Sequence, residues 1–327
     1  MTSSAFPLVA FFTALATLAA AQAQTYPANR VRIISGVAPG GPGDVATRGA
    51  AEGLARVLGQ PFVIENRPGA EGMIAGEACA KSAADGYTLC LFNGHDIALN
   101  PVLRSKMPFD PVRELTPVVH LGFAAAAIIV HPSVPANSLQ ELFALAKAKP
   151  GSINWGTSGL ASPGHIYVEW LRNALDIRFL NVPYKSALQG MQAVLSGEIQ
   201  VTSFVAGQVA PQVKAGKFKA LAVATSHRSP YLPEVPTFKE AGMEVAIVTW
   251  YGLMAPVGTP RDVVQRVNAV VAAELFGNAA MRDKYLTTPG TQVEPPAGAS
   301  IEAFAEFLKA QREMYARVVK VAGIKVE

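Results

Sequence analysis

The sequence predicts an α/β fold divided into two lobes, each a central sheet flanked by helices. Apolar, β-branched runs of strand length alternate with amphipathic helical patterns along the chain. A glycine-rich loop follows a predicted strand in each half, at residues 37–44 and 156–164. The 327 residues exceed a comfortable single core, and a chain with 50% hydrophobic and 16% charged residues suits a well-packed globular protein.

The first predicted unit alternates strand, helix, strand, helix and strand. The expected elements are a strand at 31–34, a helix from 44 to 59, a strand at 60–65, a helix at 73–81, a strand at 87–92 and a loop at 93–96. This order is typical of a parallel sheet with crossover helices. Ligands of such sheets bind beyond the carboxyl ends of the strands, where the loops at 37–44 and 93–96 would lie.

A similar unit follows and ends in two long helices. The expected elements are strands at 125–131, 153–155, 179–182, 199–205 and 218–224, and helices at 138–147, 165–174, 261–276 and 300–320. Two lobes that each present a helix N-terminus to a shared cleft would form a clamp for a small anion, because helix N-termini offer unpaired N–H groups and a positive dipole end.

The first glycine-rich loop predicts an anion site. It contains Ala38, Pro39, Gly40, Gly41, Gly43 and Asp44. We expect Asp44 to be the N-cap of the following helix, and its negative charge argues against a densely charged phosphate. The loop lacks the Gly-Lys-Ser/Thr ending of a P-loop and the G-x-G-x-x-G spacing of dinucleotide sites. A plain strand-to-helix turn that needs positive φ angles is the alternative.

The N-terminus has the pattern of a secretory signal peptide. Residues 1–24 contain no Asp, Glu, Lys or Arg, the run 6–20 is almost wholly apolar, and Ala21-Gln22-Ala23 resembles a cleavage site. A buried or disordered apolar N-terminus is the alternative. No later apolar run is long enough to span a bilayer, so we expect an exported protein, periplasmic in a Gram-negative host.

Charge and cysteine content exclude several classes of function. The formal net charge of +4 is scattered, and no Lys/Arg cluster suggests a nucleic-acid partner. The histidines and the two cysteines show no metal-ligand spacing, and no cofactor is expected. In an oxidising compartment Cys79 and Cys90 can form a disulfide, or they can remain two buried thiols; the sequence leaves both open.

A series of motifs along the mature chain resembles one family in order and spacing. The motifs are Ala38–Asp44, Leu58–Ala70, Asp85–Leu89, Asn100-Pro101, His131–Pro135, Val182–Lys185, Leu232–Thr237 and Ala255–Pro260. The chain resembles the Bug-type (TctC-like) extracytoplasmic solute receptors of tripartite tricarboxylate transporters.

The resemblance implies a periplasmic binding protein of the two-lobed, type II-like kind, with crossing strands joining the lobes. With the signal peptide predicted above at 1–23, we expect lobe 1 at 24–124 plus 250–327 and lobe 2 at 125–249. The resemblance also implies a small carboxylate ligand, membrane components of the transporter as partners, and no catalysis. We expect a monomer. Presentation of bound ligand to a two-component sensor and an exported α/β enzyme are the alternatives.

The resemblance also implies a set of ligand-binding residues. In the first lobe these belong to the loop 38–44; independently of the resemblance, Asn93 and His95 are candidates because their loop lies at the cleft side of the sheet. In the second lobe they are Thr157, Ser158, Gly159, Ser162, His165, Tyr184 and Lys185. The chain departs from the family pattern at Ser186, at Gln189-Gly190 and at Phe204, which stands where relatives often carry an acid.

Some of these residues, and some of their neighbours, can serve the fold or the surface instead of a ligand. Lys185 is more often solvated than ligand-bound at a helix start. Trp250 and Tyr251 are expected to pack in the core or at the hinge. Ser158 does not lie in a Gly-x-Ser-x-Gly motif, which argues against a serine hydrolase. Phe204 either packs in the second-lobe core or faces the cleft, where it would favour a carboxylate with an apolar or aromatic body.

Overall fold

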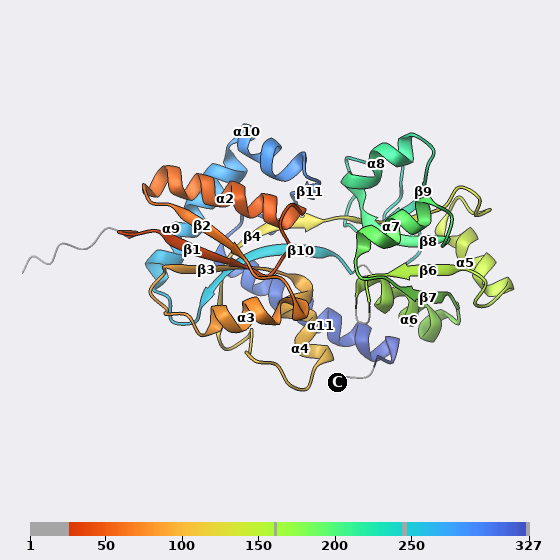
Figure 1. Ribbon diagram of the computed structural model, residues 1–327, viewed down its shortest axis with the longest axis horizontal. Coiled ribbons are helices and arrows are strands. Elements are labelled where there is room, and N and C mark those ends of the chain that lie inside the picture. Colours follow the sequence, from red (N-terminus) through yellow and green to blue (C-terminus); the bar gives the residue numbers. More distant parts are fainter. Residues whose placement is uncertain (1–25, 160–161, 244–246, 325–327) are drawn as a thin grey trace, which may run out of the picture.

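The computed structural model describes residues 26–159, 162–243 and 247–324, and the predicted signal peptide lies outside them. The chain forms two lobes, each built on one sheet (Figure 1). No helix among the described residues is long and apolar enough to cross a membrane.

The first lobe has a six-stranded mixed sheet in the order β11-β4-β10-β3-β1-β2. Its strands are β1 (Val31–Ser35), β2 (Phe62–Asn66), β3 (Thr88–Asn93), β4 (Leu115–Ala124), β10 (Thr249–Pro256) and β11 (Thr291–Gln292). The predicted parallel arrangement holds for β1, β2 and β3, whereas β10 pairs antiparallel with β3 and β4, and β11 pairs antiparallel with β4. Of these antiparallel strands, β4 leaves the lobe and β10 re-enters it, whereas β11 belongs to the C-terminal part of the same lobe.

Helices cover both faces of this sheet. They are α2 (Pro42–Leu58), α3 (Met73–Ala80), α4 (Asn100–Leu103), α9 (Arg261–Val271), α10 (Ala279–Arg282) and α11 (Ile301–Ala322). The apolar side chains of α2 and α9 share a core with one face, and those of α3 and α11 share a core with the other. A single helix was expected at 261–276, but α9 ends at Val271 and a π-helical segment, Ala272–Gly277, follows it.

The second lobe has a five-stranded sheet in the order β7-β6-β8-β5-β9. Its strands are β5 (Ala126–Val130), β6 (Asn154–Thr157), β7 (Leu180–Pro183), β8 (Val201–Val205) and β9 (Lys219–Val223). Its helices are α5 (Leu139–Ala148), α6 (Pro163–Leu175), α7 (Ala187–Leu195) and α8 (Ala206–Lys214). Residues of α5 and α6 pack on one face and those of α7 and α8 on the other.

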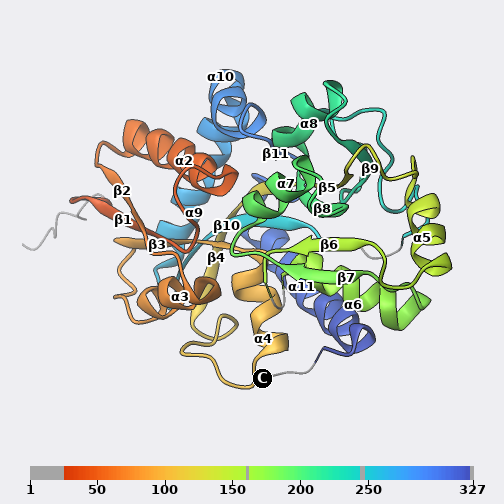
Figure 2. The same ribbon diagram turned by 45° about the vertical axis from the view of Figure 1, so that its right-hand side comes forward.

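Two segments cross between the lobes. The apolar run 121–130 is split: β4 ends at Ala124 in the first sheet, and β5 begins at Ala126 in the second. β10, which contains Trp250 and Tyr251, returns the chain to the first lobe. The C-terminal helix α11 also lies beside α6 of the second lobe (Figure 2). These connections hold the carboxyl ends of several strands around one central region.

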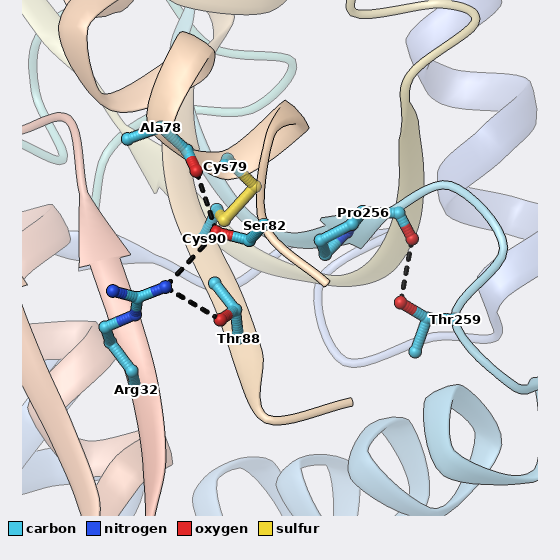
Figure 3. The surroundings of a disulfide bond; sticks show 8 residues. All are labelled: Arg32, Ala78, Cys79, Ser82, Thr88, Cys90, Pro256 and Thr259. Carbon is cyan, nitrogen blue, oxygen red and sulfur yellow. Dashed lines mark hydrogen bonds between the residues drawn. A yellow bond between two sulfur atoms is a disulfide. The ribbon is translucent and has the colours of Figure 1, made fainter. Parts of the chain in front are cut away.

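A disulfide joins Cys79, near the end of α3, to Cys90 in β3. Both residues are fully buried. Beside the disulfide, the Arg32 guanidinium of β1 donates to the hydroxyls of Ser82 (3.2 Å) and Thr88 (3.1 Å), as Figure 3 shows. The disulfide and these hydrogen bonds tie α3 to the sheet. Of the two alternatives left open by the sequence, a disulfide or two buried thiols, the structure has the disulfide.

Candidate functional site

A pocket of about 240 Å³ lies where the crossing strands meet the second-lobe sheet. It is smaller than the ~300–1,000 Å³ typical of drug-sized ligands, so it suits a small molecule. Its lining combines small, hydroxyl-bearing and apolar residues. They are Ala124, Ala126, Gly156, Thr157, Ser158, Pro163, Gly164, Ala187, Thr202, Ser203, Phe204, Val205, Ile247, Thr249 and Tyr251.

Three helices begin at this pocket. Pro163 and Gly164 are the first residues of α6, Ala187 is the first residue of α7, and Val205 is the N-cap of α8. The first N–H groups of a helix have no intrahelical partner, and the dipole places partial positive charge there. The N-caps of α6 and α7 are neutral serines, and none of the three helices has an acid in its first turn. The Ala206 N–H at the start of α8 already donates to the Ala125 carbonyl (2.7 Å), so α8 contributes chiefly its dipole, and the starts of α6 and α7 make the anion-attracting wall.

The described lining residues include no Asp, Glu, Lys, Arg or His. Two of the lining hydroxyls already donate within the protein: Thr157 Oγ1 to Asn181 Oδ1, and Thr202 Oγ1 to the Gly156 carbonyl, both at 2.8 Å. Ser158 is exposed. The hydroxyls that remain for a ligand are neutral, so electrostatic attraction to an anion comes from the helix ends.

The first-lobe loop lies beside this pocket but does not line it. Ala38, Pro39 and Gly40 are exposed. The N-cap of α2 is Gly41, with Pro42 at the first helical position, so the expectation that Asp44 is the N-cap is wrong. Proline suits that position because the first helical N–H has no partner within the helix and the φ of proline is already helical. Asp44 consequently lies inside the first turn of the helix.

The Asp44 carboxylate turns back onto its own loop. It accepts hydrogen bonds from the Gly40 N–H (3.0 Å), from Arg48 Nε (2.8 Å) and from Asn66 Nδ2 (2.9 Å). Burial opposes its ionisation, but these hydrogen bonds outweigh burial and hold the pKa of Asp44 below its ordinary value. An internal anion thus occupies part of the positive end of α2.

Gly43 connects the first-lobe loop to the pocket through Tyr251. A Cβ on Gly43 would lie 2.5 Å from Cδ1 of the Tyr251 ring, so only glycine allows this approach. Burial raises the pKa of Tyr251 to about 12, Asp96 adds to the rise, and a hydrogen bond from the Gly43 backbone opposes it. The Tyr251 ring therefore separates the start of α2 from the pocket.

Asn93 and His95 do not lie in an open loop, as the sequence led us to expect. β3 ends at Asn93, and a π-helical turn, His95–Leu99, begins almost at once. Asn93 Oδ1 accepts from the N–H groups of His95 (2.8 Å) and Asp96 (3.1 Å), so this side chain organises the turn. Neither residue lines the pocket. Burial lowers the pKa of His95 and raises that of Asp96 to about 8.

The second-lobe residues divide into two groups. Thr157, Ser158 and Phe204 line the pocket. Ser162 is the N-cap of α6: its hydroxyl donates to the Gly159 carbonyl (2.8 Å) and accepts from the His165 N–H (3.4 Å). The pocket lining does not include Gly159, Ser162 or His165; the first two shape the loop that leads into α6, and His165 lies in the first turn of α6.

Tyr184 and Lys185 lie just before α7 and outside the pocket lining. The Tyr184 hydroxyl donates to Glu198 Oε1 at 2.8 Å. Lys185 is exposed, and its backbone N–H is bound by the Gln189 side chain (3.1 Å). The structure brings neither residue to the pocket wall in this conformation.

Sequence reasoning missed most of the lining, above all Tyr251. We expected core or hinge packing for it, and it does belong to the first-lobe core with 8% of its surface exposed. It also lines the pocket, as do Thr249 of β10 and Ile247 just before this strand. Their place on the return crossing was the available signal, because a segment that passes between two lobes must border the cleft.

Two α/β lobes around a shared pocket define the class of two-lobed solute-binding proteins. The chain matches the model of the tripartite tricarboxylate transporter family receptors over residues 46–323, and it belongs to that family. It is 31% identical to BugT of Bordetella pertussis over 324 residues, covering 98% of each protein. The predicted resemblance to Bug-type receptors is confirmed.

Solved structures of similar proteins agree with this fold. One is R. palustris Rpa4515 with adipate, with a TM-score of 0.80 and 31% identity, covering 92% of this chain and 99% of that one. Another is MatC (Rpa3494) from Rhodopseudomonas palustris with bound malate, with a TM-score of 0.76 and 28% identity, covering 90% of this chain and 100% of that one.

Proposed function

We propose that this protein is a periplasmic receptor that captures a small organic carboxylate between its lobes and delivers it to the membrane components of a tripartite tricarboxylate transporter. One observation carries the proposal: three helix N-termini without acids in their first turns meet at one small pocket. Such an arrangement stabilises an anion through backbone N–H groups. Adipate and malate in the two similar structures are carboxylates as well.

Capture then requires both walls of the cleft. In this proposal the second-lobe wall, with Ser158 and the start of α6, holds the carboxylate first, and Thr157 supports that wall through its hydrogen bond to Asn181. The first-lobe loop 38–44 closes over the ligand, with Asn93 and His95 supporting that wall. The remaining predicted residues, Gly159, Ser162, His165, Tyr184 and Lys185, shape the second-lobe wall or its rim.

The lining also favours capture over chemistry. The described lining residues offer hydroxyls but no histidine, carboxylate, lysine or cysteine that could act as a general base or as an activated nucleophile. We therefore expect a bound carboxylate to be released from the pocket without chemical change.

Matched pairs of carboxylates and carboxamides test this function. Purified protein is titrated calorimetrically with hexanoate, hexanamide, benzoate, benzamide, adipate and malate, and mass spectrometry follows each compound. We expect at least one acid to bind, its amide to bind at least 30-fold more weakly, and every compound to be recovered intact. A ligand at 100 times its Kd also adds about 2.7 kcal/mol of stability, which thermal unfolding detects. Equal binding of acids and amides, or conversion of any compound, would contradict the proposal.

A further inference from the structure

The only charge at the described pocket lining is the partial positive charge of the helix ends, and this limits which further charged groups the ligand can carry. None of the described lining residues has a carboxylate side chain. An ammonium group brought into such a site would lose its hydration without gaining an ion pair, which is costly. A second charged group on the ligand therefore has no counterpart on the described wall.

Part of the pocket lining is hydrocarbon. Phe204 and Val205 from the end of β8, Ile247, Ala126 and the Tyr251 ring all line the pocket. Phe204 and Val205 also pack against buried core residues, Phe204 in the second lobe and Val205 in the first. Phe204 therefore packs on the second-lobe core and also lines the pocket. Packing keeps this apolar wall in place.

Polar groups on the ligand body would find neutral hydroxyls, and two of these are already engaged. The hydroxyl hydrogens of Thr157 and Thr202 already serve Asn181 and the Gly156 carbonyl. Burying apolar area contributes roughly 25 cal/mol per Å², and an aromatic ring gains further from edge-to-face contact with Phe204 or Tyr251. The lining therefore favours a hydrocarbon body over a zwitterionic one.

We propose that the ligand is a small carboxylate with an apolar, preferably aromatic, body and without an ammonium group. This inference rests on the proposed function and narrows it. The carboxylate lies against the starts of α6 and α7, and the body lies against Phe204 and Tyr251. Free amino acids, whose ammonium has no partner on the described lining, are rejected.

Two pairs of compounds that differ by a single ammonium group test the inference. The protein is titrated with 3-phenylpropanoate and L-phenylalanine, and with hexanoate and L-norleucine. We expect each simple acid to bind at least 30-fold more tightly than its amino acid. Equal or tighter binding of either amino acid overturns the inference. If acids bind no better than their amides, the proposed function itself fails, so the two failures are distinguishable.

Two substitutions at one position separate the apolar wall from other causes. Phe204→Asp should weaken 3-phenylpropanoate at least 10-fold and reduce the discrimination against L-phenylalanine, because its carboxylate can pair with the ammonium. Phe204→Leu keeps an apolar side chain and should retain the discrimination. Circular dichroism and thermal unfolding check both folds. Unchanged discrimination in folded Phe204→Asp overturns the inference; if that variant does not fold, loss of discrimination in Phe204→Leu does so.

Discussion

The two lobes use the same local pattern, a strand followed by a glycine-rich loop and a helix, and they use its positive end differently. In the first lobe Asp44 lies in the first turn of α2 and accepts from the Gly40 N–H. In the second lobe α6, α7 and α8 have no acid in their first turns. A built-in carboxylate competes with a ligand for the same dipole. The comparison shifts the expected grip on a ligand from the first-lobe loop, where the sequence had placed it, toward the second lobe.

The first lobe also carries the only two cysteines in the chain, so removing them tests its internal support. The disulfide closes a short loop, with a sequence separation of 11. Replacing Cys79 and Cys90 together with alanine should lower the free energy of unfolding by about 3 kcal/mol, chiefly by freeing the unfolded chain. Urea unfolding measures this change, with reduced wild-type protein as the control.

Ligand affinity should be nearly unchanged in that double variant, because the pocket belongs mostly to the second lobe. A loss of affinity larger than about 10-fold, with the fold intact, would show that the first-lobe wall contributes more than the comparison allows.

A negative charge placed on the second-lobe wall of the pocket should strongly weaken carboxylate binding. Ala187 lines the pocket at the first position of α7, where a glutamate stabilises the helix but faces the ligand. Like charges about 6 Å apart repel by about 2.8 kcal/mol at an effective dielectric constant of 20, so Ala187→Glu should weaken carboxylate binding about 100-fold. Calorimetry with the tightest-binding acid measures it.

Leu188→Glu is the matched control for this charge. Leu188 follows in the same helical turn, is 50% exposed and does not line the pocket. We expect an effect below about 3-fold from this surface charge. If both glutamates weaken binding equally, the overall charge of the lobe controls carboxylate affinity, and a local anion site at the start of α7 does not.

The architecture was predictable because it rests on local patterns. Alternating apolar runs and glycine-rich turns indicate β1, α2, β2, α3 and β3, and they indicate most elements of the second lobe. The antiparallel pairing of β10 with β3 and β4 was not predictable, since it joins segments more than a hundred residues apart. The pocket lining was missed for the same reason: Tyr251 reads locally as a core residue and meets Gly43 only in the folded chain.

A smaller effect is expected from the first-lobe loop. Gly41 has φ −77° and ψ 167°, and a Cβ there would meet nothing within 4 Å, so valine is tolerated by the fold. Its side chain would nevertheless cover the start of α2. Gly41→Val should weaken carboxylate binding about 10-fold, less than Ala187→Glu, if the first-lobe loop closes as a second wall. A loss greater than that of Ala187→Glu would reverse the comparison.

The buried Asp96 of the first lobe should make stability depend on pH. Burial raises its pKa to about 8, whereas an aspartate in the unfolded chain titrates near 3.9. The folded protein keeps a proton that the unfolded chain releases. The stabilisation is therefore fully present below about pH 4 and is lost as the pH rises to about 8.

Comparison with Asp96→Asn isolates this contribution. Across that window the wild type should lose about 1.4 kcal/mol of stability per pH unit relative to the variant. Urea unfolding at pH 5, 6, 7 and 8 measures the difference. Parallel stability curves for the two proteins would mean that Asp96 does not retain its proton in the folded state.

The smallest effect is expected at Lys185, the cation nearest the start of α7 in the sequence. Its side chain is exposed and lies outside the pocket lining, so Lys185→Ala should weaken carboxylate binding less than about 3-fold at physiological salt. Lys147→Ala is the matched control, because it removes the same charge from an exposed position on α5 of the same lobe. A loss above 10-fold in Lys185→Ala alone would place the ammonium on the ligand in the closed state. The second-lobe grip would then be an ion pair, and the contrast between an internally neutralised first lobe and an uncharged second lobe would no longer hold.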